Sequence, residues 1–142
     1  MKMFAVAMLL VAGLTLAGCG SNNNPANING NWTATLTGSQ NFNFTTSIIE
    51  NSDGTISVTN FSFSSNSSCF VSGETETGTF ALSGNFNGKV TGKFGMTVKS
   101  GMPSGNTLAL TGDVNGNTIT GTWTLTGSSG CTGNGTFTMN KS

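Results

Sequence analysis

Histidine is missing from the sequence, and this absence removes the commonest base of enzyme active sites. A serine or cysteine nucleophile needs a base beside it, so neither a Ser/His/Asp nor a Cys/His arrangement can form. A zinc site would also lack the imidazole ligand that often completes its shell. We therefore expect a non-catalytic protein, with no metal and no cofactor.

Charge is scarce as well, since charged residues make up 7% of the chain and arginine is absent. The five basic residues, all lysines, balance five acidic residues, so the formal net charge is zero. Proteins that bind nucleic acid need dense positive charge against the phosphates. The composition therefore argues against a nucleic-acid partner.

A charge-free apolar run covers residues 3–17 and follows directly on Lys2. A membrane-spanning helix needs roughly twenty apolar residues, whereas about fifteen are typical of the core of a signal peptide. The run ends in Leu16-Ala17-Gly18-Cys19, which resembles the lipobox of bacterial lipoproteins. The resemblance implies a cleaved signal peptide of residues 1–18 and a lipid-bearing Cys19 as the new N-terminus. The alternative is an ordinary secretory signal that is cleaved near Ala17.

The lipid would hold the mature protein at a membrane, because two or more acyl chains anchor a protein stably. By the sorting rule of enteric lipoproteins, Gly20 after the lipidated cysteine implies the outer membrane of the bacterial cell envelope. Residues 19–27 are rich in asparagine, and we expect them to form a flexible tether. Residues 28–142 suffice for one domain with a modest core, and we expect a monomer.

The rest of the chain is rich in threonine, serine, asparagine and glycine, and no stretch has helical periodicity. Apolar residues alternate with polar residues in run after run, which predicts an all-β domain. The alternation changes phase between Val58 and Phe61, which predicts a bulge near Asn60. The residues expected to face inward are Trp32, Ala34, Leu36, Phe42, Phe44, Ile48, Ile56, Val58, Phe61, Phe63, Phe80, Leu82, Phe86, Val90, Phe94, Met96, Val98, Leu108, Leu110, Val114, Ile119, Trp123, Leu125, Phe137 and Met139.

Tight-turn signals alternate with longer connections between these runs. Asn51-Ser52-Asp53-Gly54, Asn87-Gly88 and Asn115-Gly116 favour short hairpins, since asparagine and glycine adopt positive φ at low cost. Tight turns would then lie at one end of an up-and-down meander and long loops at the other. Inward glycines such as Gly112 and Gly121 would let the sheet coil sharply. We predict a small antiparallel up-and-down barrel of about eight strands, with a β-sandwich as the alternative.

Cys69 and Cys131 both fall in long connections at the same end of this meander. In an exported chain such a pair forms a disulfide more often than a metal site. Closing a loop of about sixty residues would contribute roughly 4 kcal/mol to stability in the chain-entropy model.

Glu74 and Glu76 lie two residues apart and therefore share one strand face. A glycosidase could use such a pair, but a solvated polar face at the long-loop end is the simpler interpretation. Asp53 and Asn51 could offer oxygens to calcium, although a tight turn explains them better.

Three of the lysines, Lys89, Lys93 and Lys99, share the outward phase of one strand. This stripe could meet an anionic polymer or a lipid headgroup, or it could simply protect the strand from edge pairing. Met102 lies in a long loop and is a candidate contact point. Together with the two glutamates, these residues form the candidate interaction surface.

The aromatic residues would fill the interior of the barrel, and no charged residue is expected to face it. The segment Ile28-Asn29-Gly30-Asn31-Trp32 resembles the Gly-x-Trp opening of lipocalins and avidins, although the other signatures of these families are missing. We expect an interaction module that binds a protein or a polymer through its long-loop end. The alternatives are a carrier of a small apolar ligand and a structural envelope protein.

Overall fold

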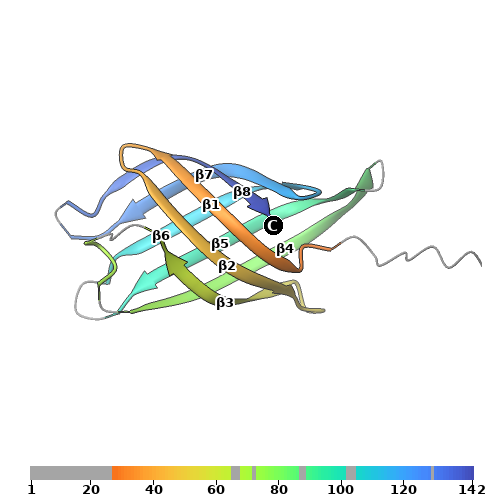
Figure 1. Ribbon diagram of the computed structural model, residues 1–142, viewed down its shortest axis with the longest axis horizontal. Helices are drawn as coiled ribbons and strands as arrows, with labels where there is room; N and C mark the ends of the chain where they lie inside the picture. The colour runs from red at the N-terminus through yellow and green to blue at the C-terminus, as the bar shows by residue number, and fades with distance from the viewer. Residues whose placement is uncertain (1–26, 65–67, 72, 87–88, 102–104, 129) are drawn as a thin grey trace, which may run out of the picture.

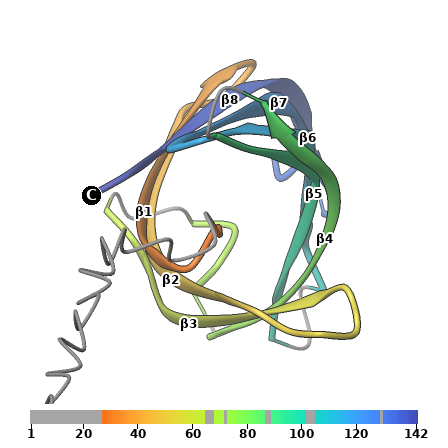
Figure 2. The same cartoon turned by 90° about the vertical axis from the view of Figure 1, so that its right-hand side faces the viewer.

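Eight strands form a closed barrel in the computed structural model, which describes residues 27–64, 68–71, 73–86, 89–101, 105–128 and 130–142. The strands pair antiparallel in chain order, and β1 closes the ring by pairing with β8 (Figures 1 and 2). The predicted all-β up-and-down barrel is therefore confirmed in preference to the sandwich. The strands are β1 (Gly30–Gly38), β2 (Phe42–Glu50), β3 (Thr55–Phe63), β4 (Glu74–Phe86), β5 (Lys89–Ser100), β6 (Thr107–Asn115), β7 (Thr118–Thr126) and β8 (Gly133–Lys141).

Inward residues from all the strands pack into one core, much as the alternation predicts. Trp32 and Trp123 are each 1% exposed. The rings of Phe42 and Trp123 meet edge to face with centroids 5.6 Å apart, and those of Phe94 and Phe137 lie 6.4 Å apart. Full burial of one phenylalanine side chain stabilises a fold by about 1.5–3 kcal/mol relative to exposure. The aromatic core is therefore a large part of what holds the ring of strands together.

The predicted bulge lies at Asn60 of β3. Thr45 pairs with Ser62, and Ser47 pairs with Thr59, so β3 carries one residue more than β2 between these pairs. Asn60 has a φ of 51°, in the left-handed region that asparagine tolerates better than most residues. The extra residue shifts the phase of β3, as a bulge does, so that Phe61 and Phe63 continue the inner face begun by Ile56 and Val58.

Leu82 of β4 is on the inner phase opposite Gly92 but does not lie in the core, so its predicted burial is wrong. It is 59% exposed because β4 and β5 extend as a hairpin past the neighbouring β3 (Figure 1). The β3–β4 ladder consists of two residue pairs, Thr55 with Thr79 and Ile56 with Gly78, so nothing in β3 lies beside Leu82. Phe86, predicted inward on the same hairpin, has a side chain outside the described residues.

The two ends of the barrel differ as the turn signals predict. The β2–β3 turn places Gly54 at a φ of 84°, and the β6–β7 turn places Gly116 at a φ of 63°. The third predicted tight turn, at residues 87–88, lies outside the described part. Ile28 is buried at this tight-turn end, directly before β1, and the longer connections lie at the opposite end. No helix among the described residues is long and apolar enough to cross a membrane.

Glycines on the inner face allow neighbouring strands to approach closely where the sheet coils. A Cβ atom on Gly121 of β7 would lie 2.0 Å from the carbonyl oxygen of Thr111, and one on Gly135 of β8 would lie 1.9 Å from that of Thr37. Any side chain at these positions would push a backbone segment away. The glycines are therefore required by the curvature of the β6–β7–β8–β1 wall.

We expect Gly121→Ala to lower the free energy of unfolding by about 1–3 kcal/mol, because overpacking at a rigid position forces the backbone to move. Gly95→Ala is the matched control, since a Cβ there points to the outer face and meets only the hydroxyl of Thr79 at 3.0 Å. Urea unfolding of both variants checks this expectation. Equal losses in the two variants would contradict the role assigned to the inner glycine.

Candidate functional site

The Cys69–Cys131 disulfide joins two of the long connections at the end of the barrel opposite the tight turns. The two Cα atoms are 5.7 Å apart, and the cysteines are 62 residues apart in sequence. Both cysteines are buried. The predicted disulfide is therefore confirmed, and it clamps the β3–β4 connection to the β7–β8 connection.

Asn106 is a second clamp at the same end, and sequence reasoning missed it. Its side chain is buried, with Nδ2 donating to the carbonyl oxygen of Cys69 at 2.9 Å and Oδ1 accepting from the backbone N–H of Ser128 at 3.0 Å. Its backbone N–H donates to the hydroxyl oxygen of Ser100 at 2.9 Å. One residue thus links the β3–β4, β5–β6 and β7–β8 connections. Nothing in the spacing of this asparagine distinguishes it from the many turn asparagines of the chain.

Gln40 brings the short β1–β2 connection, residues 39–41, into the same assembly. Its Nε2 donates to the carbonyl oxygens of Gly130 at 3.2 Å and Thr132 at 3.0 Å, and the backbone N–H of Ser39 donates to the carbonyl oxygen of Asn134. The four connections β1–β2, β3–β4, β5–β6 and β7–β8 are thereby tied to one another. We refer to them together as the loop cap.

Glu74 and Glu76 lie on the inner face of β4 where it leaves the loop cap. Glu74 pairs with Ser100 and Glu76 with Val98, and both partners are buried. Residues directly opposite each other in a ladder share one face, so the glutamates point to the same side as the buried Phe80 further along β4. The expectation of an inner face without charge is therefore wrong, while both glutamates stay partly exposed at the long-loop end.

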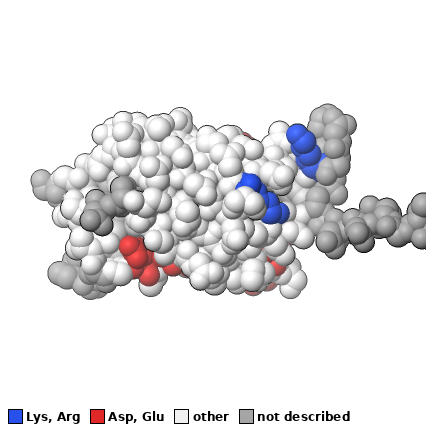
Figure 3. Space-filling view, viewed as in Figure 1, with Lys and Arg blue, Asp and Glu red and all other residues white. Residues whose placement is uncertain are grey.

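The glutamates can face inward because β3 does not cover them. β3 pairs with β4 only at Thr55–Thr79 and Ile56–Gly78, and beyond these pairs residues 57–63 of β3 diverge from residues 74–77 of β4 (Figure 1). We call this gap the seam. It is the part of the wall where inward side chains stay partly exposed, and the largest acidic patch in Figure 3 lies toward the same end of the barrel.

The β3 bank of the seam is apolar. Val58, Phe61 and Phe63 are only partly buried, although they pack against the core. Phe61 lies against Phe44 with ring centroids 4.8 Å apart, and Phe63 stacks on Phe70 of the β3–β4 connection at 5.0 Å. The seam therefore has an aromatic bank on one side and two carboxylates on the other.

The pKa of Glu76 is raised above its ordinary value of 4.5. Partial burial of the carboxyl group at the seam is the main cause, and the negative charge of Glu74 adds to it. Asp53, by contrast, has a lowered pKa because its carboxylate accepts hydrogen bonds from the hydroxyl and the backbone N–H of Thr55. Asp53 therefore serves the β2–β3 turn.

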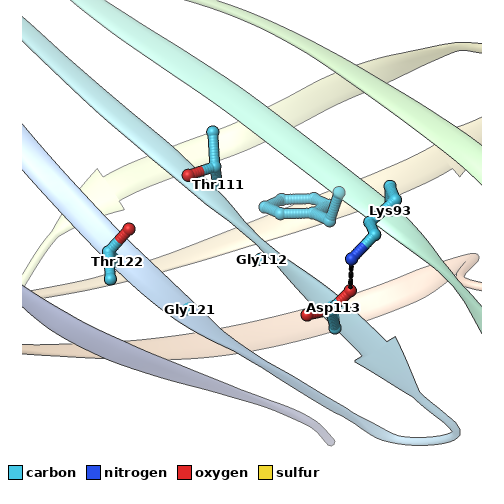
Figure 4. A pocket seen from close by; sticks show the side chains of 7 residues that line it. Lys93, Thr111, Gly112, Asp113, Gly121 and Thr122 are labelled. Carbon is cyan, nitrogen blue, oxygen red and sulfur yellow. Dashed lines mark hydrogen bonds and ion pairs between the residues drawn. The ribbon is translucent and has the colours of Figure 1, made fainter.

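The lysines of β5 are exposed but do not gather into one site. Lys89 and Lys99 lie at opposite ends of the strand, about 33 Å apart at 3.3 Å per residue. Lys93 forms an ion pair with Asp113 of β6 beside a surface hollow of about 430 Å³ (Figure 4). Both side chains are mostly exposed, so the pair contributes little to stability. Cys19 and Met102 lie outside the described residues.

No family model, no curated protein and no solved structure matches this chain. An eight-stranded barrel by itself supports many unrelated functions, so fold alone does not indicate a role. Within the described residues, no group of three histidine, cysteine, aspartate or glutamate side chains is placed to hold a metal ion. The loop cap and the seam are therefore the parts of the molecule that bear on its function.

We expect Asn106→Ala to lower the free energy of unfolding by about 2–3 kcal/mol, because it removes the hydrogen bonds that the buried Asn106 side chain forms with Cys69 and Ser128. Asn140→Ala, at an exposed position of β8, is the matched control and should change stability by less than about 0.5 kcal/mol. Urea unfolding under oxidising conditions measures both. A loss no larger than that of the control would contradict the clamp role of Asn106.

Glu76→Gln should stabilise the protein at neutral pH and have little effect in acid. A folded-state pKa above the unfolded value means that the contribution of this carboxyl group to stability is present below pH 4.5 and is lost as the pH rises through the folded-state value. Urea unfolding at about pH 3.5 and about pH 7.5 measures the difference. Glu50→Gln at the tight-turn end is the control. A gain for Glu76→Gln that is larger in acid than at neutral pH would contradict this account.

Proposed function

We propose that the chain is a bacterial envelope lipoprotein, anchored by lipid on Cys19, whose non-catalytic barrel presents the loop cap to a binding partner. The lipobox-like segment Leu16-Ala17-Gly18-Cys19 supports the anchor. The absence of histidine supports a role in binding rather than catalysis.

The position of the chain's entry into the barrel is the observation that carries this proposal. Ile28 is buried at the tight-turn end, where its carbonyl oxygen accepts a hydrogen bond from the indole N–H of Trp32 at 2.8 Å. The Nζ of Lys141 donates to the carbonyl oxygen of Asn27 at 3.1 Å. The tether is therefore fixed to the end opposite the loop cap.

The length of the tether then limits how the barrel meets the membrane. Asn27 lies eight positions after Cys19, and such a segment reaches at most about 28 Å when fully extended. A lipid on Cys19 keeps the tight-turn end on the membrane side. The loop cap lies further out by the height of a nine-residue strand tilted by about 35–45° in the barrel wall, about 20–25 Å.

The clamps of the loop cap also favour a binding role. The described parts of the loop cap are held by a disulfide and by the hydrogen bonds of Asn106, so these parts lose little conformational freedom when a partner binds, and this lowers the entropic cost of binding. A second candidate function, the carriage of a small apolar ligand, is supported by the partly exposed Phe61 and Phe63 at the seam. Aromatic contacts such as that of Phe42 with Trp123 argue instead for a filled interior.

Site-specific photo-crosslinking in cells tests the proposal on the full chain. A photoreactive residue at Thr132 of the loop cap should give a discrete crosslinked product, whereas one at Asn117 of the tight-turn end should not. Crosslinks of equal yield at both positions, or at Asn117 only, would overturn the proposed orientation.

The anchor is tested separately. The wild-type chain should begin at Cys19, carry the added mass of lipid and fractionate with membranes, while Cys19→Ser should leave the membrane fraction. A wild-type mass equal to that of the bare polypeptide would overturn the anchor. For the carrier alternative, saturable binding of an apolar dye in the barrel with no crosslinked partner at Thr132 would favour carriage over interaction.

A further inference from the structure

We propose that the seam between β3 and β4 binds an extended segment of a partner polypeptide, which adds to the barrel as a strand and directs a lysine or arginine toward Glu74 and Glu76. This inference deepens the proposed interaction role and rests on it for its cellular setting, because the seam opens beside the loop cap.

Two open strand edges make the seam suitable for strand addition. The β3–β4 ladder ends at Ile56 and Gly78. Beyond it, residues 57–63 pair with β2 and residues 74–77 pair with β5, and no described strand pairs with their other edges. Open edges present backbone N–H and C=O groups that an extended peptide can pair with. The occupant is therefore extended polypeptide rather than a folded surface or a small molecule.

The two banks of the seam indicate which side chains the segment carries. Continued in register, the ladder would place Val58 of β3 opposite Glu76 of β4. The β3 bank offers Val58, Phe61 and Phe63, all partly buried and packed on the core. Inward side chains of an added strand would touch these apolar groups, so at least some of them are apolar. Affinity would come from the backbone and specificity from these alternate positions.

The β4 bank selects for positive charge. Neither Glu74 nor Glu76 forms an ion pair within the described part of the chain. The ion pair found there joins Lys93 and Asp113. A lysine or arginine has an aliphatic stem that can lie along the aromatic bank while its charged end reaches the carboxylates. An acidic segment would be repelled at the same position.

The same charges disfavour a second copy of this chain as the occupant. Two seams that met edge to edge would bring four carboxylates together, and like charges at an interface cost binding energy. Lys99 lies opposite Thr75 beside the seam, but its side chain is exposed on the outer face of the wall, while Lys89 and Lys141 lie toward the tight-turn end. A different, cationic polypeptide is the better match.

Binding of three synthetic peptides to the full chain in detergent tests the proposal. Each has about nine residues, the length of an ordinary strand, with threonine at alternate positions. The first carries valine and lysine at the remaining positions. The second replaces the lysines with glutamate, and the third replaces two threonines with proline, which cannot donate to a ladder. Fluorescence anisotropy of labelled peptides reports the dissociation constants.

We expect the lysine peptide to bind at least tenfold more tightly than either control peptide. Glu74→Gln with Glu76→Gln should weaken it about fivefold to tenfold, because each partly exposed charge pair is worth about twofold to fivefold. Glu50→Gln, at the other end of the barrel, should leave its binding unchanged.

Several results would overturn the proposal. Equal binding of the proline peptide would exclude strand addition, and equal binding of the glutamate peptide would exclude the charge preference. A partner segment at the seam would be excluded if the lysine peptide did not bind at concentrations up to about 1 mM. It would also be excluded if the wild-type chain formed dimers and Glu74→Gln with Glu76→Gln made these dimers stronger. If Thr132 crosslinks to a partner in cells but the lysine peptide does not bind, the proposed function of the loop cap stands and the seam proposal is wrong. If the peptide binds but Thr132 gives no crosslink, only the proposed function of the loop cap is wrong.

Discussion

The covalent link between Cys69 and Cys131 holds the barrel together at the point where its strand ladder is shortest. β3 and β4 share two residue pairs, whereas neighbours such as β6 and β7 pair along their whole length. Near the loop cap, hydrogen bonding between β3 and β4 cannot close the ring. The disulfide and Asn106 do so instead by fixing the β3–β4 connection to the opposite wall. A partly open wall can therefore exist in a small domain without unravelling.

The two ends of the barrel differ in the side chains that they present. At the tight-turn end, the chain enters through the buried Ile28 and is held by Lys141. At the other end, the inner face reaches solvent along the seam, with aromatic rings on one bank and carboxylates on the other. If the tight-turn end is tethered to a membrane, the chemically distinctive surface faces away from it. The outer walls, rich in threonine, offer no comparable contrast.

Local patterns in the sequence were sufficient for the eight strands, the bulge at Asn60 and the disulfide. These features depend on alternation, on turn residues and on which end of a meander a loop occupies. Alternation counted back from Phe80 already places Glu74 and Glu76 on the inner face, but their partial exposure and the exposure of Leu82 could not be predicted in this way, because β4 has 13 residues and its neighbour β3 has nine. Alternation gives the face of a residue but not whether a neighbouring strand covers it. Asn106 was missed because the partners of its side chain come from two distant connections.

Amide hydrogen exchange on the oxidised full chain, followed residue by residue, tests most directly whether the wall is open between β3 and β4. The account predicts that amides of residues 57–63 and 74–77 that point into the seam exchange far faster than those at the centre of the β6–β7 ladder. Protection of the seam amides equal to that of β6 and β7 would contradict it, because these edges would then be paired and could accept no further strand.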